Sequence, residues 1–107
     1  MNDLIRPALY AALHPITTVR RPARATRWIR ADIVGPVCET GDAFLSDWPI
    51  PDVDAGELLA IWGAGAYGFE LSSNYNSRCR PVEVLARGAR YSVIRRRETY
   101  ADLVRGE

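Results

Sequence analysis

Lysine is absent from this sequence of 107 residues, because all 14 of its basic residues are arginine. A lysine amine is the group with which proteins form Schiff bases to carbonyl compounds. The arginine guanidinium stays protonated and cannot replace that amine. This chain alone is therefore excluded from Schiff-base chemistry.

Other features that the sequence lacks exclude further classes. The net charge of +1 gives no electrostatic footprint for nucleic acid. No apolar run reaches the roughly 18 residues of a membrane span, and no glycine-rich phosphate loop lies between a strand and a helix. Residues 1–6 lack the basic end and apolar core of a signal peptide, so we expect a cytoplasmic protein.

Cysteine and histidine are scarce as well. In a reducing compartment the two cysteines, Cys38 and Cys79, are predicted to be free thiols. His14 is the one histidine, and it has no cysteine or carboxylate ligands at metal-binding spacing. We predict no metal site and expect His14 to be structural.

The stretch Gly35-Pro36-Val37-Cys38-Glu39-Thr40-Gly41-Asp42 places a thiol beside a carboxylate, between two turn signals. Residues 27–34 before it alternate like a strand, so Cys38 and Glu39 are predicted to lie on a loop just past a strand end. A thiol can donate or accept a proton, and a carboxylate can hold a cationic group. The pair alone is a weak signal, because cysteine is more often a small buried hydrophobe.

The rest of the chain predicts one mainly β domain over residues 1–107. We expect about five or six strands in a small Greek-key barrel or sandwich. Residues 57–62 are nearly all apolar and predict a strand buried on both faces, whereas the prolines of 46–52 exclude a central strand and predict irregular chain. Further strands are expected at 16–19 and 27–34, a hairpin at 81–86 and 90–95, a short helix at 69–75 and a closing helix at 99–106.

Two segments leave alternatives open. Residues 2–13 have the apolar spacing of a helix, but Pro7 would break it, so a short strand or turn is as good an interpretation. Residues 20–26 form a basic loop that suits either an anion site or a solvated connection, and the connection is favoured.

Four blocks, in order, carry a resemblance to a known family. They are Arg6-Pro7-Ala8-Leu9-Tyr10, the stretch 35–42, Gly65-Ala66-Tyr67-Gly68-Phe69 running into residues 73–78, and Arg95-Arg96-Arg97-Glu98-Thr99-Tyr100. Together they resemble the C-terminal domain of diaminopimelate decarboxylases, which are fold-type III pyridoxal-phosphate (PLP) enzymes. The resemblance covers nearly the whole chain and implies a β domain like the C-terminal domain of alanine racemase, without the (β/α)8 barrel.

The resemblance implies roles for five residues. The cysteine matching Cys38 reaches the active site of the other subunit of a homodimer and takes part in protonation. The glutamate matching Glu39 holds the distal ammonium of meso-diaminopimelate, and Arg6 and Tyr10 would hold its distal carboxylate. Tyr67 matches the tyrosine that donates its hydroxyl to the PLP phosphate. These groups suit the chemistry, since a guanidinium fork and a phenol read carboxylates and phosphates through hydrogen bonds.

The missing lysine limits what the resemblance implies. PLP enzymes bind the cofactor through a lysine, which in this family lies in the barrel that precedes the β domain. The chain therefore resembles the second half of a lysine-forming decarboxylase, with a barrel domain as its partner. The alternatives are a related decarboxylase for a polyamine precursor such as carboxynorspermidine, and a solitary, non-catalytic interaction module.

Overall fold

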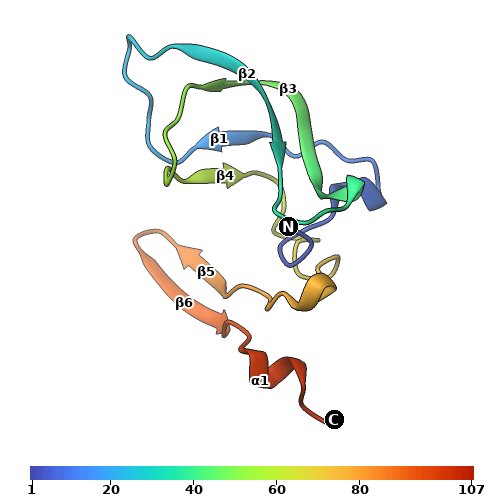
Figure 1. Ribbon diagram of the computed structural model, residues 1–107. Helices are drawn as coiled ribbons and strands as arrows, with labels where there is room; N and C mark the ends of the chain where they lie inside the picture. Colours follow the sequence, from blue (N-terminus) through green and yellow to red (C-terminus); the bar gives the residue numbers. More distant parts are fainter.

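Six short strands dominate the computed structural model, which describes residues 1–107 (Figure 1). They pair as three separate antiparallel ladders, β1 with β4, β2 with β3, and β5 with β6. The structure has no helix of the length and apolar character that crossing a membrane requires. The strands are β1 (Ile16–Thr18), β2 (Trp28–Val34), β3 (Ala43–Pro51), β4 (Leu59–Ile61), β5 (Glu83–Arg87) and β6 (Arg90–Arg95). The helices are α1 (Tyr100–Leu103) and the 3-10 turns η1 (Pro7–Leu9), η2 (Thr40–Asp42) and η3 (Tyr75–Ser77).

The mainly β class is confirmed, and so is a closing helix, which is shorter than predicted. Thr99 and Asp102 form a capping box at the start of α1, as the threonine and the acid three residues later predict. The helix expected over 69–75 is wrong. Residues 69–71 form a turn and residues 72–74 have no regular structure, and η3, which begins at Tyr75, contains Asn76 at a φ of 57°, a left-handed conformation that cannot continue a helix. Closure into a Greek-key barrel or sandwich stays a prediction, because the ladders are three separate pairs.

The irregular chain predicted over 46–52 is instead part of β3, the longest strand. Pro49 lies opposite Arg30 and Pro51 opposite Trp28 in the ladder with β2. Proline removes a backbone donor, which a central strand needs on both sides. Because β3 pairs with β2 alone, its other edge needs no donors and the prolines are tolerated.

The prediction of full burial for residues 57–62 is also wrong. The strand is shorter, β4, and pairs with β1 on one side only, with Ile16 opposite Ile61. Leu58 is 71% exposed and Trp62 is 57% exposed. A continuous apolar strand is typical of a segment covered on both faces, so the surface beside β4 has the composition of a core without the covering layer.

A small core joins the N-terminal segment to the two upper ladders in Figure 1. Its buried members are Ile5, Ile16, Phe44 and Leu45. Trp48 packs against them and donates its indole N–H to the carbonyl of Ile16 at 2.9 Å. This cluster places residues 2–10, which are turns and the η1 helix rather than a longer helix, beside the β2–β3 hairpin.

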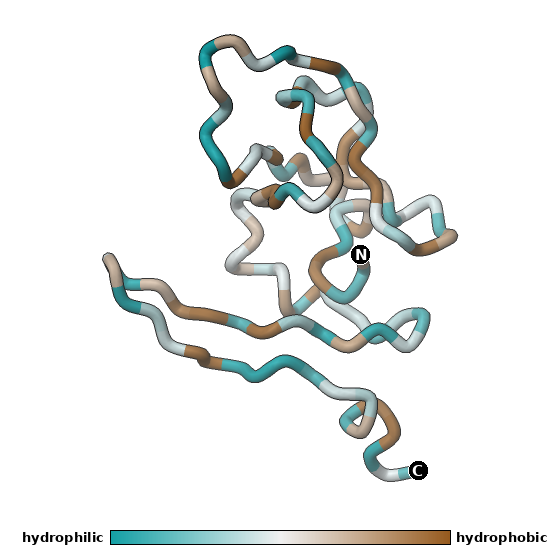
Figure 2. Tube along the Cα trace, turned by 60° about the vertical axis from the view of Figure 1, so that its left-hand side comes forward, coloured by the Kyte–Doolittle hydropathy of each residue, from teal (hydrophilic) through white to brown (hydrophobic).

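The β5–β6 hairpin extends away from this core, at the bottom of Figure 1. Gly88, at a φ of +61°, makes its turn, and the predicted hairpin is confirmed. Figure 2 shows apolar stretches along both strands, and they include Leu85, Val93 and Ile94, each more than half exposed. The radius of gyration is 15.5 Å, larger than the roughly 13 Å of a compact domain of this length.

Because the core is small, the loss of one methyl group from it should have a measurable effect on stability. We expect Ile16→Val to lower the free energy of unfolding by about 0.5–1.5 kcal/mol, since Ile16 is 2% exposed. The matched control is Ile94→Val on the 61% exposed hairpin position, for which we expect a change below about 0.5 kcal/mol. Urea denaturation measures both, and equal losses would contradict the described core.

Candidate functional site

The Cys38–Glu39 loop joins β2 to β3, past the strand end, as predicted. Asp42, which is 4% exposed, closes the loop: its carboxylate accepts the N–H of Val37 at 2.8 Å, and its carbonyl accepts the N–H of Gly35 at 2.7 Å. A Cβ at Gly35 would collide with the Asp42 carboxylate, so the position requires glycine. Cys38 lies exposed on this closed loop, and its thiol makes no hydrogen bond within the chain.

Glu39 turns back toward the N-terminal segment. Its carboxylate accepts hydrogen bonds from the Asn2 amide at 3.0 Å and from Arg6 Nη2 at 2.5 Å. It also accepts the backbone N–H of Gly41 at 3.3 Å. The hydrogen bonds from Asn2 and then Arg6 hold the pKa of Glu39 below its ordinary value. Glu39 is therefore an anion, ready to hold a cation.

Arg6 is the second member of this pair, so the structure brings two predicted binding residues together. Its guanidinium is half-buried, and its Nε is buried without a hydrogen-bond partner. An unpaired buried donor is uncommon in a native fold and marks capacity for a further acceptor. Arg6 and Glu39 thus present opposite charges side by side.

Tyr10 and Tyr67 form a second group. Together with Leu9 and Leu71 they line a cavity of about 450 Å³. Tyr10 is half-buried, which raises the pKa of its phenol, whereas Tyr67 is 62% exposed. The cavity walls are apolar, so the two hydroxyls are the side-chain polar groups that it offers a ligand.

His14 is a residue of this region that the sequence prediction treated as structural only. It is 7% exposed and lies 2.7 Å from the Tyr10 hydroxyl through Nε2 and 3.0 Å from the Trp62 carbonyl through Nδ1. The four-residue spacing between Tyr10 and His14 was the available signal, but residues 10–14 are not helical, so the spacing alone did not predict the contact.

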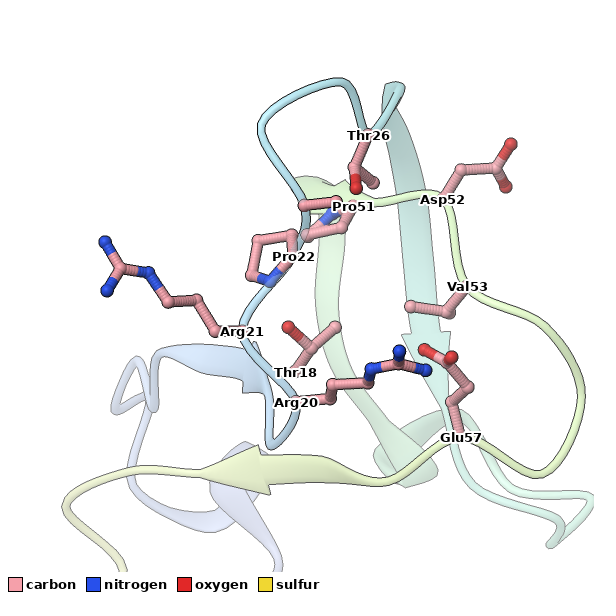
Figure 3. Close-up of a pocket in the computed structure, with 10 residues that line it drawn as sticks. Thr18, Arg20, Arg21, Pro22, Thr26, Pro51, Asp52, Val53 and Glu57 are labelled. Atoms are coloured by element: carbon pink, nitrogen blue, oxygen red, sulfur yellow. The ribbon is translucent and has the colours of Figure 1, made fainter.

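A different pocket lies at the far end of the β2–β3 hairpin (Figure 3). It has a volume of about 300 Å³, and it includes the basic loop at 20–26. Asp52 and Glu57 line it as well, and Figure 3 shows Arg20 pointing toward Glu57 while Arg21 points away. Balanced charges do not favour an anion site, which supports the interpretation as a solvated connection.

Comparison with known proteins identifies the family of this chain. A family model described as the pyridoxal-dependent decarboxylase C-terminal sheet domain matches residues 1–65. The chain belongs to this family. The matched residues include the Arg6–Glu39 pair, Tyr10 and Cys38.

Relatives and solved structures extend the match to nearly all of this decarboxylase domain. It is 54% identical over 107 residues to the diaminopimelate decarboxylase of Pseudomonas fluorescens, and 47% identical over 106 residues to that of Methanothermobacter thermautotrophicus. The crystal structure of diaminopimelate decarboxylase from M. jannaschi matches with a TM-score of 0.89 at 40% identity, covering 100% of this chain and 24% of that one. These two matches cover 100% and 99% of this chain, respectively, but the chain spans only about a quarter of the length of each relative.

The Glu39 hydrogen bonds generate a pH-dependent prediction. Because they lower the folded-state pKa, they stabilise the fold above the ordinary carboxyl pKa, and this contribution is lost as the pH falls through the folded-state pKa. We expect Glu39→Gln to lower the urea midpoint at neutral pH and to have a smaller effect at an acid pH below the lowered pKa of Glu39, where the wild-type carboxyl is neutral as well.

The matched control for this experiment is Glu70→Gln, an exposed position whose carboxylate makes no hydrogen bond or ion pair within the chain. It should leave the difference between the two pH values unchanged. If Glu39→Gln and Glu70→Gln behave alike at both pH values, Glu39 does not have the described partners.

Proposed function

We propose that the chain is the C-terminal portion of a diaminopimelate decarboxylase, which converts meso-diaminopimelate to L-lysine and CO2. The observation that carries the proposal is the contact between Arg6 and Glu39, within a chain whose relatives bear that enzyme's name. The substrate has two amino-acid centres, and the one that does not react carries an ammonium and a carboxylate. A paired carboxylate and guanidinium match that centre charge for charge.

Binding of the distal centre exchanges one ion pair for two. Glu39 takes the ammonium in place of the Arg6 guanidinium, and Arg6 takes the carboxylate with its planar fork of donors. Tyr10 contributes a hydroxyl to the same carboxylate. Ornithine and arginine have no distal carboxylate, so this set favours diaminopimelate.

The cofactor PLP fits this chain only in part. No lysine is available to bind it, so that residue belongs to a barrel domain outside this sequence. Tyr67 lines the cavity that it shares with Tyr10, and its exposed hydroxyl is a neutral donor suited to the cofactor phosphate. When bound, PLP withdraws electrons from the substrate α-carbon and so permits loss of CO2.

Cys38 supplies the proton that replaces the lost CO2. Its Sγ is exposed on a loop that Asp42 closes, so the thiol is presented outward and not consumed by a contact within the chain. That presentation suits delivery into the active site of a second subunit, and we include a homodimer in the proposal. Glu39, the next residue, then holds the ammonium of the same substrate molecule.

The barrel partner would cover the exposed apolar surfaces. Leu58 and Trp62 beside β4, and Val93 and Ile94 on β6, are each more than half exposed. These exposed apolar side chains on two separate ladders are available for contact with another layer. With a barrel in place the protein would be a cytoplasmic biosynthetic enzyme.

A non-catalytic interaction module is the second candidate. The absence of lysine favours it for the isolated chain, and so does the exposed apolar surface. It does not account for Arg6, Glu39 and Cys38 together, because protein–protein contact has no need of an exposed thiol beside an ion pair.

The deciding experiment measures lysine formation from meso-diaminopimelate and PLP, with the chain alone and with an added barrel half. We expect activity only in the mixture. Cys38→Ala should reduce kcat at least about a hundredfold, the lower range for removal of a positioned proton donor. The half-buried Cys79 provides the matched control: Cys79→Ala should retain activity.

Each other outcome has a definite meaning. Activity from the chain alone would refute the argument from lysine. An inactive mixture that nevertheless contains a stable complex of the two halves would transfer support to the interaction module.

A further inference from the structure

The buried imidazole of His14 is the group in this region to which the proposed mechanism gives no part. It lies between a backbone carbonyl and the hydroxyl of Tyr10, the proposed carboxylate ligand. Its ring meets the Tyr10 ring edge-on, with centroids 5.7 Å apart and an interplanar angle of 84°. Both ring nitrogens are thus within hydrogen-bond distance of protein atoms, and the ring is fixed from both ends.

The Trp62 carbonyl decides which nitrogen of neutral His14 carries the proton. A carbonyl oxygen can only accept, so Nδ1, 3.0 Å away, must be the N–H donor. In neutral imidazole the other nitrogen is then a bare acceptor. Nε2, 2.7 Å from the Tyr10 hydroxyl, therefore accepts the hydroxyl proton.

This direction of donation has a consequence for ligand recognition. While Tyr10 donates to His14, its oxygen offers only lone pairs to a ligand, which suits an ammonium and not a carboxylate. When His14 is protonated, both of its nitrogens donate, and the Tyr10 hydroxyl is free to donate elsewhere. We propose that His14 is a positioning residue that sets the hydrogen-bond direction of Tyr10, so that Tyr10 donates to a substrate carboxylate only while His14 is a cation.

The groups that these contacts place against the imidazole come from two segments of the chain. They are Tyr10 from the chain after η1, and the Trp62 carbonyl and Gly63 from the chain after β4; a Cβ added at Gly63 would lie 3.9 Å from Nδ1. Tyr10 is the one titratable group among them, and burial keeps its phenol neutral around neutral pH.

The first test is independent of catalysis. Nitrogen NMR of the ¹⁵N-histidine-labelled chain reads one histidine, so no assignment is needed. We expect neutral His14 to carry its proton on Nδ1, and Tyr10→Phe to shift the Nε2 resonance. The matched control Tyr91→Phe, on a 75% exposed side chain, should leave it unshifted. A proton on Nε2, or an Nε2 resonance indifferent to Tyr10→Phe, would overturn the proposal.

The second test rests on the proposed function and measures KM and kcat for meso-diaminopimelate with the barrel half present. In wild type we expect KM to rise on the order of tenfold as the pH increases through the titration of His14 seen by NMR, which is the size of one hydrogen bond to a charged group. His14→Gln should remove this step in KM while kcat keeps its own pH profile. Tyr10→Phe should also remove the step in KM, and combining Tyr10→Phe with His14→Gln should cause no further change.

Two variants separate the role of His14 in folding from its role toward Tyr10. The amide of asparagine can occupy the Nδ1 position and keep the bond to Trp62, whereas the amide of glutamine can occupy the Nε2 position and keep the bond to Tyr10. His14→Asn should fold and lose the KM step as His14→Gln does. A KM step of unchanged size in either folded variant would overturn the proposal. If neither the wild type nor any variant forms lysine, the proposed function fails. The NMR experiment still tests the direction of the hydrogen bond between His14 and Tyr10.

Discussion

The buried carboxylate of Asp42 is the group on which the arrangement of the site depends. It accepts the N–H of Val37, and with the Asp42 carbonyl, which accepts from Gly35, it fixes the chain between β2 and β3. A charged group buried to this degree requires hydrogen-bond partners, since an unpaired one would cost several kcal/mol, on the order of 3–5. The loop cannot relax without exposing or stranding that carboxylate. Its closure is what presents the Cys38 thiol outward and turns Glu39 inward.

Arginine chemistry explains why the partly buried guanidinium groups of the chain are paired with carboxylates. A guanidinium cannot lose its proton, so wherever it is partly buried it needs an acceptor. Arg78 meets Asp3 at 2.7 Å, and Arg80 meets Glu98 at 3.2 Å, and both pairs tie the segment after η3 to distant parts of the chain. The Arg6–Glu39 pair differs from these in its position. It lies beside the exposed thiol of Cys38, whereas the other two hold turns together, so the same interaction serves structure in two places and, in the proposed function, substrate recognition in the third.

Local features of the fold were predictable from the sequence, and features that depend on a covering layer were not. Gly88 between two alternating runs predicts the β5–β6 hairpin, and Thr99 with Asp102 predicts the start of α1, because both depend on neighbouring residues alone. The burial of Leu58 depends on a layer across the sheet, and no residue of this chain supplies that layer. Pro49 excludes a central strand but not a strand with a free edge, and the number of neighbours is a tertiary property.

The candidate site divides in the same way. The resemblance placed Arg6, Tyr10, Cys38, Glu39 and Tyr67 in one functional set, but no spacing rule shows that Arg6 meets Glu39, because 33 residues separate them and the core brings their segments together. The separation of four residues between Tyr10 and His14 allows a contact, but it does not show which of the two side chains donates the hydrogen bond. It requires knowing that the Trp62 carbonyl, 48 residues from His14, takes the other ring nitrogen. The donor and acceptor roles in these hydrogen bonds are thus the hardest part of the site to predict from the sequence, because they depend on a tertiary contact with a carbonyl oxygen, which can only accept.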